Sequence, residues 1–305
     1  MSDTTLIKEK IDQAIGILDE HGIDCWITFV RESGMMRDPM LDFLCPADMT
    51  WHSAFIITRS GETHAIVGQM EKQTVDELGV WGRVTGYVEG IKADLLGYLK
   101  GLDPTSIAVN YSRTSEVCDG LTHGMYLLLE EMLAEIGFQD RLVSAGKVIS
   151  SLRARKTATE LERMRAAIGH TLDIFGMVES YIEPGRTEKE IAAFMAREAE
   201  TRGLAFGWDP AHCPAVFTGP DTAGAHYQPT DRKVERGHVL NMDFGLKVED
   251  YTSDLQRTFY ILDEGETAEP PEVRRGFDTI VTAIELAQQA LKPGVQGVAV
   301  DTAAR

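Results

Sequence analysis

The stretch that decides the fold is Asn241-Met242-Asp243-Phe244-Gly245, followed by Tyr251-Thr252-Ser253-Asp254-Leu255-Gln256-Arg257-Thr258-Phe259. Both parts are short runs rich in apolar and β-favouring residues, so they predict two neighbouring strands. Aspartate is unfavourable in strands and costly to bury without a partner. Asp243, inside an apolar strand, therefore marks this pair of strands as a candidate functional site.

A hairpin accounts for the spacing between Asp243 and Asp254. A symmetric loop centred between Val248 and Glu249 would place the two residues directly opposite each other, with Cβ atoms about 5 Å apart. Two carboxylates at that distance repel, so the pKa of one should rise. A pair of divalent cations roughly 3.5–4 Å apart would remove the repulsion. In the alternative interpretation, Asp243 is a turn or cap residue and Asp254 is a solvated strand residue.

Composition limits the class of protein. The chain has 305 residues, of which 43% are hydrophobic, and its formal charge is −18. These values predict a folded protein of about two ordinary domains, and they argue against binding to nucleic acid or to an anionic membrane surface. The N-terminus lacks the apolar segment of a signal peptide, and no run approaches the roughly 18 apolar residues of a membrane span. The cysteines have neither zinc-site nor disulfide spacing, which favours buried thiols in the cytoplasm; they are Cys25, Cys45, Cys118 and Cys213.

The first half of the chain alternates between helical and strand patterns. Hydrophobic periodicity predicts a helix over 5–21, and an apolar run predicts a buried strand over 25–30. A hairpin is expected next, and then a strand between two helices. Such alternation favours an α/β domain. The later elements are expected at 54–58 and 64–67 for the hairpin, 89–101 and 120–137 for the helices, and 106–110 for the strand.

A basic run from Ser150 to Lys156 is the candidate domain boundary. Two capping boxes follow, one pairing Thr157 with Glu160 and the other pairing Thr187 with Glu190, and each predicts the start of a helix. These helices should end near Ile182 and Arg202, and strands at 215–218, 239–244 and 251–262 and a helix at 272–291 should follow. We therefore expect one domain over 1–152 and a second over 153–305.

Together, the motifs resemble those of the pita-bread metallopeptidases, peptidase family M24, which includes Xaa-Pro aminopeptidases, prolidases and creatinase-like enzymes. The resemblance rests on Gly224-Ala225-His226-Tyr227, on Asp243-Phe244-Gly245 and on the D-x-x-R-T-F pattern that begins at Asp254. Arg155-Lys156-Thr157 is similar to the family's entry into its catalytic domain. The resemblance implies an α/β N-terminal domain of the creatinase/prolidase type and an α+β pita-bread catalytic domain.

The resemblance also implies roles for individual residues. Asp243 would chelate one metal ion and Asp254 would bridge two, the ions being manganese, zinc or cobalt. His226 would hydrogen-bond the substrate near the scissile carbonyl, while Arg257 and Thr258 would orient Asp254. The implied substrate is a peptide with proline in second position, attacked by a metal-activated hydroxide, and the implied assembly is a homodimer. From the residues alone, His226 before a proline-containing loop is also compatible with a structural role.

The sequence departs from the family's pattern beyond Asp254. The family uses three further ligands, one His in an H-G-x-G-H segment and two Glu, and none of these is present; no histidine follows Asp254. We therefore expect a catalytic domain that is truncated at its C-terminus and inactive on Xaa-Pro peptides by itself. Two alternatives remain open: a creatinase-like amidinohydrolase, which does not need the metals, and a non-catalytic binding module that retains the fold.

Overall fold

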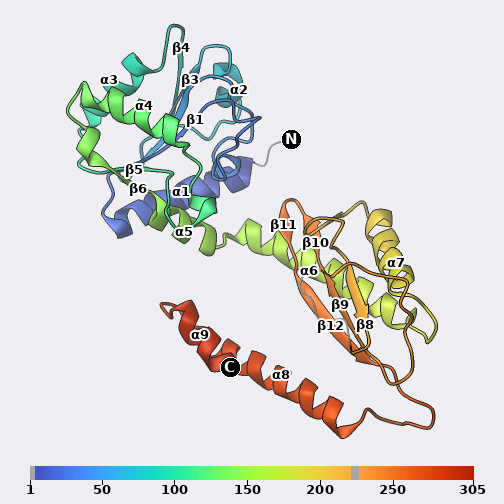
Figure 1. The fold of residues 1–305 in the computed structure, drawn as a ribbon. Helices are drawn as coiled ribbons and strands as arrows, with labels where there is room; N and C mark the ends of the chain where they lie inside the picture. The colour runs from blue at the N-terminus through green and yellow to red at the C-terminus, as the bar shows by residue number, and fades with distance from the viewer. Residues whose placement is uncertain (1–3, 221–226) are drawn as a thin grey trace. The chain divides into compact units, whose positions relative to one another are not determined.

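The chain forms two compact units in the computed structural model, which describes residues 4–220 and 227–305. The first unit comprises Met1–Leu161 and the second Glu162–Arg305. The division falls within helix α6, Ala158–Glu179 (Figure 1).

A mixed six-stranded sheet organises the first unit, in the order β4-β3-β2-β1-β5-β6. The central strand β1 pairs antiparallel with β2 and parallel with β5, so antiparallel and parallel pairing meet at this strand. The predicted strand over 25–30 and the predicted hairpin are confirmed, whereas β4 and β6 were not predicted. The strands are β1 Cys25–Val30, β2 Ser53–Thr58, β3 Thr63–Gly68, β4 Arg83–Tyr87, β5 Ile107–Val109 and β6 Leu142–Ser144.

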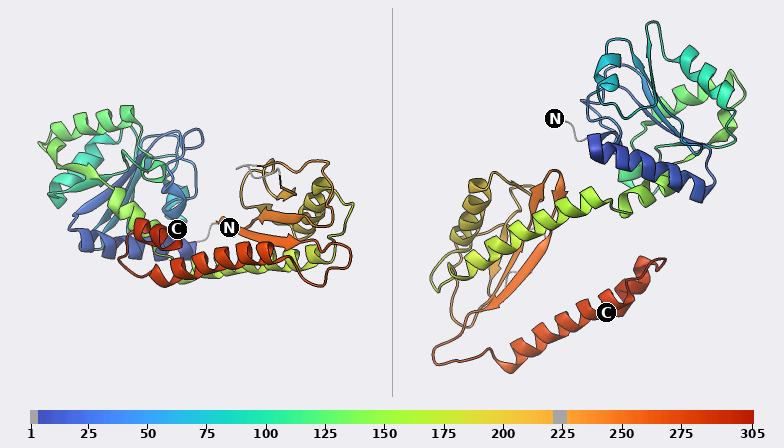
Figure 2. Two further views of the ribbon diagram at one scale, coloured as in Figure 1. Left: turned by 60° about the horizontal axis from the view of Figure 1, so that its bottom comes forward. Right: turned by 180° about the vertical axis from the view of Figure 1, so that it is seen from behind.

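Helices cover both faces of this sheet (Figure 2), which confirms an α/β architecture. On one face α1 and α5 bury residues such as Ile11, Leu18 and Val148 against Trp26 and Phe55. On the other face α3 and α4 bury leucines against the intervening positions of β1 and β2, as the alternation of side chains along a strand requires. The helices are α1 Thr4–His21, α2 Lys72–Asp76, α3 Lys92–Leu102, α4 His123–Ala134 and α5 Gly146–Ala154, with single turns at Leu41–Phe43, Glu116–Cys118 and Gln139–Arg141.

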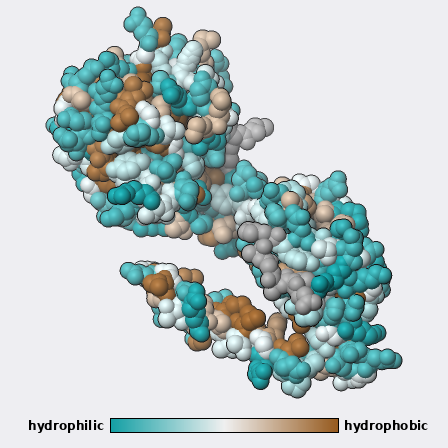
Figure 3. Space-filling model, viewed as in Figure 1, coloured by the Kyte–Doolittle hydropathy of each residue, from teal (hydrophilic) through white to brown (hydrophobic). Residues whose placement is uncertain are grey.

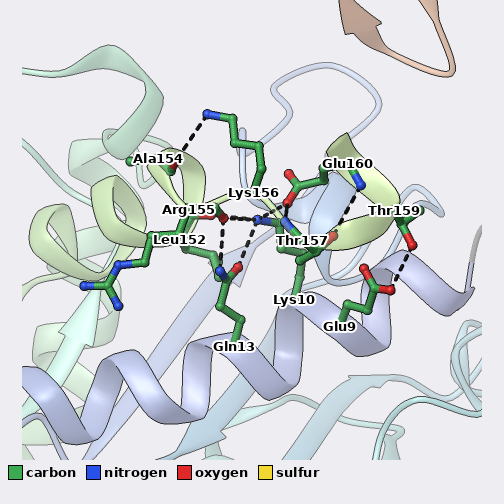
Figure 4. Close-up of polar contacts among 10 residues, drawn as sticks. All are labelled: Glu9, Lys10, Gln13, Leu152, Ala154, Arg155, Lys156, Thr157, Thr159 and Glu160. Atoms are coloured by element: carbon green, nitrogen blue, oxygen red, sulfur yellow. Dashed lines mark hydrogen bonds and ion pairs between the residues drawn. The ribbon is translucent and has the colours of Figure 1, made fainter. Parts of the chain in front are cut away.

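A buried ion pair joins α1 to the beginning of α6 (Figure 4). Lys10 Nζ lies 2.6 Å from Glu160 Oε2, and the two side chains are 0% and 2% exposed. Lys10 also donates to the carbonyl oxygen of Leu152 at 2.7 Å. Glu160 Oε2 accepts the backbone N–H of Thr157 at 2.7 Å, which confirms the predicted capping box. Burial lowers the pKa of Lys10, and the hydrogen bond to Glu160 opposes that shift.

The second unit contains two three-stranded sheets, β12-β9-β8 and β11-β10-β7. Two helices, α6 and α7, pack on one face of the first sheet, and their residues Phe175 and Met195 lie in one core with Met242 and Phe244 of β9. The capping box of Thr187 and Glu190 at the start of α7 is confirmed. The elements are α7 Glu188–Thr201, β7 Ala205–Phe206, β8 Ala215–Thr218, β9 Val239–Phe244, β10 Leu246–Val248, β11 Tyr251–Thr252 and β12 Leu255–Tyr260.

Two further helices, α8 Pro271–Ala290 and α9 Gly297–Ala304, end the second unit. All residues of α8 are described and none of them is buried. Phe277, Ile280 and Ile284 recur at steps of three and four and are 47%, 62% and 55% exposed, so α8 presents an apolar stripe at its surface (Figure 3). Among the described helices, none is both long and apolar enough to span a bilayer.

Candidate metal and catalytic site

Asp243 lies within β9, as predicted, but the predicted register is wrong. Across the β9–β12 pair, the residue opposite Asp243 is Gln256 rather than Asp254. The reason is the turn, because Val248 pairs with Tyr251 and the loop consists of Glu249 and Asp250. Both loop residues have positive φ, 46° and 67°, which is the backbone of a type I′ hairpin turn. The centre of the hairpin is thus displaced by one residue from the expected position.

This displacement leaves Asp243 and Asp254 on the same face of the hairpin. Shifting the pairing by two positions preserves the alternation of side chains, so the two residues become diagonal neighbours instead of opposite ones. Asp254 lies between β11 and β12, where the hairpin passes from one three-stranded sheet to the other. Asp243 is half-buried, whereas Asp254 is exposed.

Close contacts of Ser253 and Gly245 fix the backbone at this passage between the sheets. Ser253 is 3% exposed, its hydroxyl accepts the N–H of Leu246 at 2.9 Å and it contacts the Thr171 hydroxyl of α6 at 2.7 Å. Gly245 comes so close to Ser253 that an added Cβ would lie 2.0 Å from the Ser253 carbonyl oxygen and 2.7 Å from the Trp208 ring. Only a glycine therefore fits, and this close approach positions Asp254 next to Asp243.

The electrostatics of the pair agree with the repulsion that was expected from the sequence. The pKa of the Asp243 carboxyl is raised above its ordinary value, first by burial and second by the charge of Asp254. A hydrogen bond from Gln256 Nε2 to Asp243 Oδ2, 3.2 Å long, acts in the opposite direction. Asp243 Oδ1 is buried, and no N–H or O–H group in residues 4–220 or 227–305 donates to it.

Polar residues extend the face that carries Asp243. Asn241, two positions earlier on β9, lies opposite Thr258 and donates from Nδ2 to the Thr258 hydroxyl at 2.8 Å. Asn241 and Gln256 were not identified from the sequence. The signal that would have found them is the strand alternation combined with the correct turn, because the two-residue loop at Glu249 and Asp250 places Gln256 opposite Asp243.

The structure does not bring Arg257 to this face. Arg257 pairs with Met242, whose side chain lies in the core. Its guanidinium carbon is 5.3 Å from the centre of the Phe175 ring of α6, and its Nη1 donates to the carbonyl oxygen of Gln256. Thr258 does share the face of Asp243, where it contacts Asn241. His226 lies outside the described residues, and its expected role stays a prediction.

The donor set fits part of a divalent cation site. Two carboxylates lie side by side, and one buried oxygen has no donor in the described residues, so a cation near Asp243 would relieve both the repulsion and the burial cost. Divalent metals need about four or more ligands. Within the described part of the chain, no group of three or more His, Cys, Asp or Glu residues converges, so these carboxylates account for only some of the ligands of a complete site.

Comparison with known sequences assigns the second unit to a protein family. Residues 162–305 match the profile of metallopeptidase family M24. Over 166 residues the chain is 32% identical to a probable dipeptidase PepE of Mycobacterium bovis, a match that covers 53% of this chain and 41% of the relative. It is 30% identical over 143 residues to a probable Xaa-Pro aminopeptidase of Verticillium alfalfae, covering 47% of this chain and 24% of the relative. The chain thus matches less than half the length of these curated relatives.

Comparison with solved structures covers nearly the whole chain. An Xaa-Pro dipeptidase from Bacillus anthracis superposes with a TM-score of 0.65 at 18% identity, over 98% of this chain and 76% of that one. Dipeptidase PepE from Mycobacterium ulcerans superposes with the same TM-score at 24% identity, over 99% and 76%. These likenesses confirm the fold class that was predicted from the sequence.

Proposed function

We propose, from the match of residues 162–305 to the profile of metallopeptidase family M24, that the chain supplies part of the site of an Xaa-Pro aminopeptidase or dipeptidase. Asp243 and Asp254 would hold divalent metal ions. The observation that carries the proposal is the pair itself: two neighbouring carboxylates, one with a raised pKa and a buried oxygen without a donor in the described residues.

Bound divalent metal would supply an activated hydroxide and would polarise the peptide carbonyl. The chain's own residues would keep the pair in place. Gln256 holds Asp243 through its amide, and Ser253 ties the backbone next to Asp254 to Thr171 of α6. His226 would hydrogen-bond the substrate near the scissile carbonyl. Thr258 would act through Asn241, which it contacts at 2.8 Å.

The proposal also covers the partners and location of the protein. The substrate would be a peptide with proline in second position, since two of the similar proteins are named as Xaa-Pro peptidases. A homodimer is implied by the family resemblance. A cytoplasmic location agrees with four cysteines that are all buried and free, because a reducing compartment preserves such thiols.

Metal titration of the purified chain tests the carboxylate pair. We expect weak, chelator-sensitive binding of Mn²⁺, because two carboxylates provide fewer ligands than a closed site needs. D243N and D254N should abolish this binding. D250N is the matched control, because Asp250 is an exposed carboxylate in the adjacent turn and asparagine tolerates positive φ equally well. Binding that is unchanged in D243N would disprove the assignment.

Substrate assays separate the candidate reactions. With two ligand carboxylates, we expect the 305-residue chain to hydrolyse no Xaa-Pro dipeptide at a measurable rate. Metal-dependent turnover that a chelator abolishes would show that this expectation is wrong while supporting the peptidase assignment. Hydrolysis of creatine without added metal would instead favour the amidinohydrolase.

A further inference from the structure

A groove of about 940 Å³ lies against β6, the last strand of the sheet in the first unit. β5 and β6 pair in parallel, so their carboxyl ends lie at the same end of the sheet. After β5 the chain forms α4 on one face, and after β6 it forms α5 on the other. The lining of the groove includes the segment 111–115, which follows β5, and the first turn of α5. In open α/β sheets, small molecules bind where two such connections diverge to opposite faces.

The charge of this groove differs from that of the whole chain. Its lining includes two cations, Arg113 and Lys147, and no aspartate or glutamate, although acidic residues outnumber basic ones by 48 to 30. Both cations are exposed, and neither forms an ion pair within residues 4–220 and 227–305. Asp119 accepts the backbone N–H of Ser112 at 2.9 Å but does not line the groove. The groove therefore attracts an anion, unlike most of this acidic chain.

One hydroxyl group joins the two walls of the groove. Ser144 Oγ donates to the carbonyl oxygen of Tyr111 in the segment after β5. It also accepts the N–H of Gly146, the first residue of α5, at 3.1 Å. The N-cap residue Ala145 makes no side-chain hydrogen bond to the first turn of α5, and N–H groups at the start of a helix favour a negative charge. The walls are thus held in place before a ligand binds, which lowers the cost of binding.

Serine and threonine account for much of the remaining surface. They make up seven of the fifteen lining residues. The Ser112 hydroxyl accepts the N–H groups of Thr114 and Ser115 at 3.2 and 3.1 Å, so its own hydrogen remains to be donated. The groove has the volume of a site for a whole small molecule, about 300–1,000 Å³, rather than for a bare ion. A matching ligand therefore has an anionic group and an organic part that carries hydroxyl groups.

We propose that this groove binds a sugar phosphate, with Arg113 and Lys147 contacting the phosphate group and the serine and threonine side chains contacting the sugar. A phosphate monoester carries a charge of about −1.5 to −2 and three strong acceptor oxygens at neutral pH, which matches two cations beside a helix N-terminus. Sugar hydroxyls match serine and threonine, because each hydroxyl both donates and accepts. All lining residues belong to the first unit, so this site goes beyond the peptidase function proposed above.

Titration of the full 305-residue chain with ribose 5-phosphate, inorganic phosphate and citrate tests the groove, with calorimetry for affinity and amide chemical shifts for location. Ribose 5-phosphate should bind saturably and should shift the amide signals of residues 112–115 and of Lys147. Inorganic phosphate lacks the sugar and citrate lacks the phosphate, so each should bind about tenfold more weakly, the equivalent of about 1.4 kcal/mol. Either of them binding as tightly as ribose 5-phosphate, or shifts confined to other segments, would overturn the proposal.

Matched variants separate the groove from a general effect of charge. R113Q and K147Q each remove one cation from the groove and should weaken ribose 5-phosphate about tenfold. R83Q in β4 and K100Q in α3 make the same change of charge outside the groove and should leave the affinity unchanged. All four side chains are exposed, so the Tm should change little. Equal losses in all four variants would refute a specific site. D243N should bind ribose 5-phosphate like the wild type, since that substitution reports on the peptidase proposal alone.

Discussion

Gln256 lies directly opposite Asp243 across β9 and β12 and donates its amide N–H to the Asp243 carboxylate at 3.2 Å. Asp254 occupies the diagonal position, and its charge raises the pKa of Asp243. The hairpin therefore gives Asp243 one neighbour that stabilises its charge and one that opposes it. The charge on the Asp243 and Asp254 carboxylates should therefore depend on pH and on bound cations.

The metal-free chain should become more stable when Asp243 is neutralised. Its pKa is raised, first by burial and second by Asp254, so the folded state keeps the proton to higher pH than the unfolded state. Stability is therefore lost as the pH rises from the unfolded carboxyl pKa, about 3.9, through the folded pKa, and this loss persists at neutral pH. D243N should raise the Tm at pH 7, and the difference from wild type should vanish below about pH 4.

Calorimetric melts over this pH range, with and without Mn²⁺, check that prediction. Added metal should raise the Tm of the wild type more than that of D243N, since a ligand stabilises the state that binds it. A D243N variant that melts below wild type at neutral pH without metal would contradict the electrostatic explanation.

Gly245→Ala should be strongly destabilising. The new Cβ would lie 2.0 Å from the Ser253 carbonyl oxygen, so the backbone next to Asp254 must move, at a cost of about 3 kcal/mol. G245A should also lose Mn²⁺ binding, because the movement separates the two carboxylates. Gly169 in α6 is the control: no atom lies within 4 Å of an added Cβ there, and G169A should stabilise by about 0.5–1 kcal/mol. Urea unfolding curves of both variants decide the comparison.

Lys10→Met should destabilise the first unit by about 3 kcal/mol, because it removes the Nζ that lies 2.6 Å from the buried Glu160 carboxylate. Adding E160Q to K10M should cost little more, since the second substitution neutralises the carboxylate that Lys10 contacts. A double-mutant cycle from denaturant unfolding measures the coupling between the two residues. Additive losses would show that Lys10 acts through its packing and backbone hydrogen bonds rather than through Glu160.

The thiols should be inert in the folded chain. Burial raises the pKa of Cys25 to about 12 and that of Cys45 to about 11, so hardly any thiolate forms at neutral pH. Cys118 and Cys213 are each 1% exposed. A chromogenic disulfide reagent should therefore modify the native chain slowly and should titrate all four thiols rapidly in denaturant. Rapid reaction of any one cysteine in the native state would identify local opening around it.

Most of the elements around the site could be predicted from local patterns. Both capping boxes, the strand containing Asp243 and the shared face of Asp243 and Asp254 follow from residue type and alternation. The register of β9 against β12 did not follow from residue type. Glycine or asparagine usually marks a type I′ turn, whereas here Glu249 and Asp250 adopt positive φ. In the first unit, Lys10 resembles a solvated residue of an amphipathic helix, and only the fold brings it to Glu160.

Arg257 shows a different limit of sequence reasoning. The family pattern associates it with Asp254, yet it lies an odd number of positions from that residue, and alternation already places the two on opposite faces. The structure agrees, since Arg257 lies over Phe175. A sequence motif shows which residues occur together, whereas the alternation of side chains along a strand determines which of them lie on the same face.

The two-residue turn at Glu249 and Asp250 also constrains which insertions and deletions the gene can tolerate. If the turn keeps two residues, adding or removing a single codon would shift the pairing of the following strand by one residue and turn Asp254 away from Asp243, whereas a longer loop or a bulge would be needed to absorb an extra residue. A change of two codons preserves the shared face. As long as the two-residue turn is kept, insertions and deletions of two residues should therefore be tolerated better than those of one, although Glu249 and Asp250 are both exposed.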